Sequence, residues 1–139
     1  MGEAFGALAW DDHLGWWKGA AEFAPGRRIG VHVEANNDPA ALQAAVARAG
    51  PLWDRLRALE LSVRAAVVSQ LTAAHNEFCA PEDEVTEAQF AERMRPLSVK
   101  FEVAGGVEVV FADRTLLGGH WIVVPVGPDG TVGEAITAG

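Results

Sequence analysis

The residue best placed to do chemistry is His120, which stands in the stretch LLGGHWIVVPVGPDG at residues 116–130. An imidazole at the start of a strand can act as a general base or a ligand, and the two preceding glycines let a backbone or a small molecule come close. The alternative is a histidine that only bonds a neighbouring loop, because no acidic partner stands at a fixed local spacing from it. His120 is therefore a candidate binding residue, and no catalytic residue is assigned.

A metal centre or a nucleophile has less support. His75 and Cys79 are four residues apart, a spacing that places two ligands on one helix face, but a structural metal site needs further ligands. The sequence contains no CxxC, HxH or HExxH motif, and no phosphate-binding loop or GxSxG elbow. We therefore expect no metal, no cofactor and no covalent catalysis.

The tryptophans suggest recognition. Trp16 and Trp17 are adjacent on an expected strand, so their side chains face opposite sides of the sheet. One of them should stand near charged residues on the wet side of the sheet, unless residues 5–10 cover it, and large rings beside charges are typical of a binding patch. The candidate binding residues are Trp16, Trp17, His32, Lys100, Glu102, His120 and Trp121.

Helices and strands are segregated along the chain. A hairpin is expected first, followed by three helices. The hairpin comprises residues 13–23 and 29–34 around Pro25-Gly26. The helices comprise residues 40–49 after Asp38-Pro39 and ended by Gly50, residues 51–78 with apolar residues at steps of three and four, and a short helix from the Thr86/Gln89 capping box to about Arg95.

Four further strands are expected in the last third, as a meander of residues 97–103, 107–111, 120–126 and 131–136. Residues 120–126 are apolar on both faces, which predicts a position inside the sheet. The fold class is therefore α+β, with an antiparallel sheet of about six strands and the helices packed on one face. At 139 residues, the chain is expected to form one domain.

Composition excludes several classes of function. Nineteen acidic and 11 basic residues give a formal charge of -8, which repels nucleic acid. This charge either serves solubility alone or attracts a basic partner. The single cysteine excludes an intramolecular disulfide framework and indicates a reducing compartment. Because neither a signal peptide nor an apolar membrane segment is recognised, a soluble cytoplasmic protein is expected.

Several short features together resemble the bacterial family named domain of unknown function 2262. They are LGWWKG at residues 14–19, Trp53 near the start of the long helix, Phe90, residues 107–113, Gly119-His120 before an apolar strand, Asp129-Gly130, and the terminal Gly139. The resemblance implies the same order of elements and a bacterial origin.

Three hypotheses on function follow. The first is a non-enzymatic protein-interaction module, similar to the small acidic immunity proteins that neutralise a basic toxin domain. The second is a ligand-binding or enzymatic domain with a pocket near His120. The third is a homo-oligomer whose sheet face is its own interface.

Overall fold

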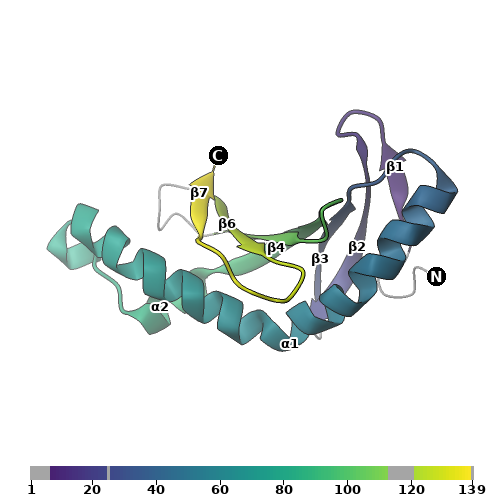
Figure 1. The fold of residues 1–139 in the computed structure, drawn as a ribbon. Helices are drawn as coiled ribbons and strands as arrows, with labels where there is room; N and C mark the ends of the chain where they lie inside the picture. Colours follow the sequence, from purple (N-terminus) through teal and green to yellow (C-terminus); the bar gives the residue numbers. More distant parts are fainter. Residues whose placement is uncertain (1–6, 25, 113–120, 139) are drawn as a thin grey trace.

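In the part of the chain that the structure describes, seven strands form one sheet, and a long helix runs along it (Figure 1). The computed structural model describes residues 7–24, 26–112 and 121–138. The fold is α+β, and the sheet is mostly antiparallel, with its strands in chain order. The strands are β1 (Ala9–Asp11), β2 (Trp16–Ala24), β3 (Arg27–Val33), β4 (Arg95–Phe101), β5 (Val107–Ala112), β6 (Trp121–Val126) and β7 (Ile136–Ala138). The helices are α1 (Pro39–Phe78), the short 3₁₀ helix η1 (Pro81–Asp83) and α2 (Glu87–Arg93).

The two helices expected on either side of Gly50 are one continuous helix, α1, of 40 residues. Its start is as predicted, because Asp38 accepts a hydrogen bond from the Ala41 amide and Pro39 occupies the first turn. A break in the helix was predicted at Gly50-Pro51, because a proline inside a helix removes one backbone hydrogen bond. Ala49 and Leu52, on either side of the expected break, are both buried in the same core. Packing against the sheet therefore stabilises a continuous helix across Gly50 and Pro51, two residues of low helix propensity.

The pairing of β3 with β4 is parallel, which corrects the expectation of a purely antiparallel sheet. The chain leaves β3, returns along α1 and α2 on one side of the sheet, and enters β4 in the direction of β3 (Figure 1). A connection of this length and helical content is what joins parallel strands.

The ends of the sheet also differ from expectation. β1 is an additional strand that pairs with β2, and its three residues gave too short a pattern to identify. The last strand is not at residues 131–136: Val132 makes one isolated bridge to Val126, and β7 begins at Ile136. Between them, the Ala135 amide donates to Oε1 of Gln70 on α1, which ties this segment to the helix.

The turns and the short helix follow local chemistry. Thr86 and Gln89 form the predicted capping box at the start of α2, which docks through the fully buried Phe90. Gly26 has φ 75°, as the third position of the predicted β2–β3 turn requires, whereas Pro25 lies outside the described residues. The β4–β7 meander is confirmed in its order.

The core lies between α1 and one face of the sheet. Val31, Val99, Val109 and Val124 are paired across four strands and are all buried on that face. Trp53 of α1 is the largest fully buried side chain among the described residues, and its ring contacts two phenylalanines of the sheet. The opposite side of the sheet, called here the open face, has no described helix over it (Figure 1).

Candidate functional site

Strand register determines which side chains lie on the open face. His32, Lys100, Glu108 and Pro125 are paired across β3 to β6, and alternate with the buried valines along their strands. The next row along the strands contains Gly30, Ser98, Val110, Val123 and Ile136. The two rows are about 7 Å apart, because successive residues on one face of a strand are separated by two steps of about 3.4 Å.

An aromatic and cationic cluster occupies one part of the open face. The Trp16 and His32 rings are stacked, with centroids 5.0 Å apart, and Lys100 Nζ lies 5.3 Å from the centroid of a Trp16 ring. A cation over the face of an indole is attracted by the charge distribution of the ring. The structure thus brings together three of the predicted residues, which we call the Trp16 cluster.

Carboxylates neutralise the cations beside this cluster. Lys100 Nζ lies 3.3 Å from Glu108 Oε1, and Lys18 Nζ lies 3.2 Å from Asp11 Oδ2. The pKa of Asp11 is lowered, first by the hydrogen bond from the Leu14 amide and then by Lys18. The cluster is therefore locally balanced in charge, although the chain as a whole carries -8.

Apolar side chains cover the neighbouring part of the open face. Val110, Val123 and Ile136 are paired across β5, β6 and β7. Trp121 is two residues before Val123 on β6, so its side chain lies on the same face. Trp121 is 54% exposed and Ile136 is 56% exposed. We call these four residues the apolar patch. Only Trp121 was predicted, although the apolar residues on both faces of residues 120–126 were a signal for Val123.

The remaining candidates lie elsewhere. Trp17 faces the helix side, where its Nε1 donates to the Asn36 carbonyl at 3.1 Å and its ring meets Trp10 edge-on. Glu102 follows the end of β4, where its backbone bonds both Gly105 and Gly106 in the turn to β5. His120 and the glycines before it lie outside the described residues.

The His75 and Cys79 pair makes no metal centre in the described part of the chain, where no group of three or more His, Cys, Asp or Glu could hold an ion. The Nδ1 atom of His75 lies 3.0 Å from Asn76 Oδ1, and its ring packs edge-on against Phe90. The Asn76 side chain makes two hydrogen bonds to the backbone of Val85: Nδ2 donates to the Val85 carbonyl, and Oδ1 accepts from the Val85 amide. This corner therefore joins the end of α1 to the start of α2.

The half-buried His32 predicts a pH dependence of stability. Burial, followed by the positive charges of Lys18 and Lys100, lowers the pKa of His32 below its ordinary value of about 6.5. The unfolded chain then binds a proton at a pH where the folded protein does not. Stability should therefore fall as the pH drops below about 6.5, until the lower pKa of the folded state is reached.

The measurement is the midpoint of urea unfolding between pH 7.5 and 5, for the wild type and for His32→Phe, which keeps a ring against Trp16. The variant should lose less stability over this interval than the wild type. His13→Phe, in the exposed turn between β1 and β2, is the control for removing an imidazole as such. If the urea midpoint falls equally with pH in the wild type and in His32→Phe, the pH dependence does not come from His32.

The chain matches one known protein family. The sequence model of the family described as "Uncharacterized protein conserved in bacteria (DUF2262)" matches residues 2–136. No curated protein and no solved structure gives a significant match. Among the described residues, no helix has both the length and the apolar character needed to cross a membrane.

Proposed function

The chain belongs to the bacterial DUF2262 family, and we propose that it is a non-enzymatic protein-interaction module, which binds a basic protein partner on the open face of its sheet. The observation that carries this proposal is the apolar patch. Val110, Trp121, Val123 and Ile136 lie on the solvent side of three adjacent strands, where alternation would ordinarily place polar residues. An immunity-like role is one form of the proposal, and it predicts a toxin gene directly beside the gene of this protein.

The composition of the open face fits a binding surface. Trp121 offers a large and rigid contact area at low entropic cost, and tryptophan is enriched among the residues that dominate binding energy. Beside it, the Lys100–Glu108 and Lys18–Asp11 pairs supply polar groups of the kind found around an apolar centre.

The charge of the chain favours a basic partner. Because Lys18 and Lys100 are each paired with a carboxylate, the excess negative charge does not come from the Trp16 cluster. A charge of -8 acts at long range and raises the encounter rate with a positive protein, while the apolar patch makes the contact. We therefore expect association that slows with added salt but retains an apolar component.

The test compares two exposed aromatic residues. Trp121→Ser removes the centre of the apolar patch, whereas Phe78→Ser removes an 85% exposed ring at the end of α1. Each full-length protein is used to capture partners from lysate of the source bacterium, and the protein that is enriched is then purified and titrated. We expect Trp121→Ser to weaken its binding at least about tenfold, as for an interface hot spot, and Phe78→Ser to leave it unchanged.

The partner itself supplies the second measurement. It should have a basic isoelectric point, and its association rate should fall between about 50 and 500 mM NaCl because screening shortens the reach of the charges. An acidic partner, or equal affinity of Trp121→Ser and wild type, would contradict the proposal. A wild-type dimer in solution that Trp121→Ser dissociates would instead assign the open face to self-association.

A further inference from the structure

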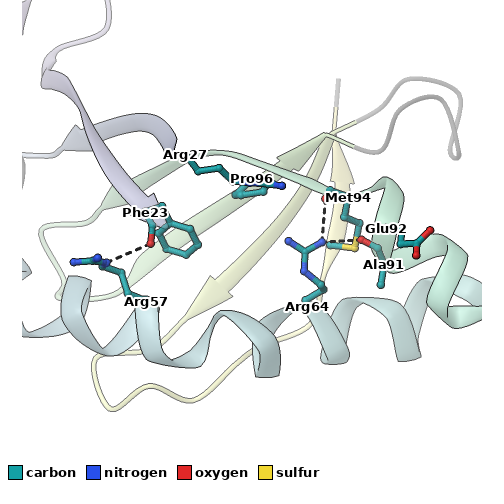
Figure 2. A pocket seen from close by; sticks show the side chains of 8 residues that line it. All are labelled: Phe23, Arg27, Arg57, Arg64, Ala91, Glu92, Met94 and Pro96. Carbon is teal, nitrogen blue, oxygen red and sulfur yellow. Dashed lines mark hydrogen bonds between the residues drawn. The ribbon is translucent and has the colours of Figure 1, made fainter. Parts of the chain in front are cut away.

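A cavity of about 540 Å³ lies on the helix side of the sheet, away from the open face (Figure 2). It is bounded by α1, by the end of β2 with the turn to β3, and by the junction of α2 with β4. Its volume falls within the range of pockets that hold small molecules. None of the residues singled out in the sequence lines it.

Three arginines line this cavity in a chain that is strongly acidic overall. Arg57 and Arg64 are seven residues apart on α1, so they lie on nearly the same side of the helix, separated by about 10 Å along its axis. Arg27 approaches from the opposite wall, at the start of β3 (Figure 2). Glu92 is the carboxylate on the wall formed by α2.

The backbone holds two of these guanidinium groups in place. Arg57 Nε donates to the Phe23 carbonyl at 3.3 Å. Arg64 Nη1 donates to the carbonyls of Ala91 and Met94, at 2.8 and 2.9 Å (Figure 2). The acceptors are backbone carbonyl oxygens, so these bonds fix the orientation of both side chains. An arginine oriented in this way loses less conformational entropy when it binds an anion.

Apolar groups complete the lining. Phe23, Met94 and Pro96 are all buried residues that contribute to the wall between the arginines. A ligand that fits both features carries an oxyanion for the guanidinium groups and an apolar part for this wall.

We propose that this arginine pocket binds a small organic oxyanion, a phosphate ester or carboxylate with an aromatic or other apolar body. Arg27 contacts the anionic group, Arg57 adds positive charge from the α1 wall, and Arg64 positions the wall formed by α2. Glu92 lowers the affinity by repelling the same anion. The inference is independent of the proposed protein-binding function, because the pocket and the open face lie on different sides of the sheet.

The experiment is an NMR titration of the full-length protein with phenyl phosphate and with benzoate, which separates the two sources of the oxyanion. Inorganic phosphate and phenol are the controls for the apolar body and for the charge. Phenyl phosphate or benzoate should bind at least about tenfold more tightly than phenol, and phenyl phosphate more tightly than inorganic phosphate. Amide shifts should concentrate at residues 23–27, 57–64 and 91–96.

Four variants test the residues. Arg27→Gln and Arg57→Gln should each weaken binding of the tighter probe about tenfold, and Glu92→Gln should strengthen it severalfold. Arg55→Gln, an exposed arginine two residues from Arg57 and outside the lining, should have no effect. Because Arg27 is exposed at the start of β3, its variant tests the proposal even if Arg57→Gln lowers stability. Affinities unaltered by Arg27→Gln, or phenol binding as tightly as both anionic probes, would overturn it.

Discussion

Replacement of Trp53 by alanine is expected to lower the free energy of unfolding by about 3–5 kcal/mol, the range measured for removal of a large aromatic side chain from a core. Trp53 is 1% exposed and lies on the face of α1 that meets the sheet. Its ring centroid lies 5.6 Å from that of Phe23 on β2 and 6.4 Å from that of Phe101 on β4. The Trp53 side chain therefore packs between the helix, the hairpin and the meander. Because a protein core is closely packed, its removal leaves a cavity that the neighbouring side chains fill only in part.

The measurement is equilibrium unfolding in urea, followed by far-UV circular dichroism so that the loss of a fluorophore does not affect the signal. Trp121→Ala is the matched control, because the same side chain is removed from the exposed side of β6. It should cost less than about 1 kcal/mol, as surface substitutions do. Similar losses in the two variants would show that the core is not centred on Trp53.

Replacement of Arg64 by methionine is expected to lower the free energy of unfolding by about 1.5–3 kcal/mol, the contribution of hydrogen bonds made by a charged group. Arg64 donates hydrogen bonds to two backbone carbonyls. One belongs to Ala91 in the last turn of α2, and the other belongs to Met94, which directly precedes β4. Its guanidinium carbon also lies 5.7 Å from the centroid of the Phe111 ring on β5. Methionine keeps the apolar stem but leaves both half-buried carbonyl groups without this donor.

Arg55→Met is the control for the loss of a positive charge from α1, because Arg55 is exposed on the same helix. Hydrogen exchange should locate the effect of Arg64→Met at α2 and the start of β4, which the side chain ties to α1. If both arginine variants have the same stability, the two carbonyl bonds contribute nothing measurable to the fold.

Local sequence signals predicted individual elements well. The Thr86 capping box and the Asp38-Pro39 helix start each act within a few residues, and both are present in the structure. The helix also ends at Phe78 as predicted, but Phe78, the last apolar residue of the predicted buried stripe, is exposed. The apolar runs at residues 107–111 and 120–126 likewise identified β5 and β6. These features depend on residues that are close together in the chain, so a single sequence contains the information.

Features that depend on distant parts of the chain were missed. Pro51 lies inside a helix because the packing of Ala49 and Leu52 on the sheet outweighs one lost hydrogen bond. The parallel pairing of β3 with β4 follows from the path of α1 across one side of the sheet. β1 and β7 have three residues each, and a periodic pattern cannot be recognised over so short a segment.

For the candidate site, the sequence by itself determined that Trp16 and Trp17 face opposite ways, and that His32 and Lys100 alternate with core residues on their strands. Only the tertiary structure decided that Trp16 is the one on the open face, and that Val110, Trp121, Val123 and Ile136 come together beside it. It alone brought Arg27, Arg57 and Arg64 around one cavity. The reason is physical: side-chain direction is set by the local backbone, whereas neighbours across strands are set by register and by the packing of the whole chain.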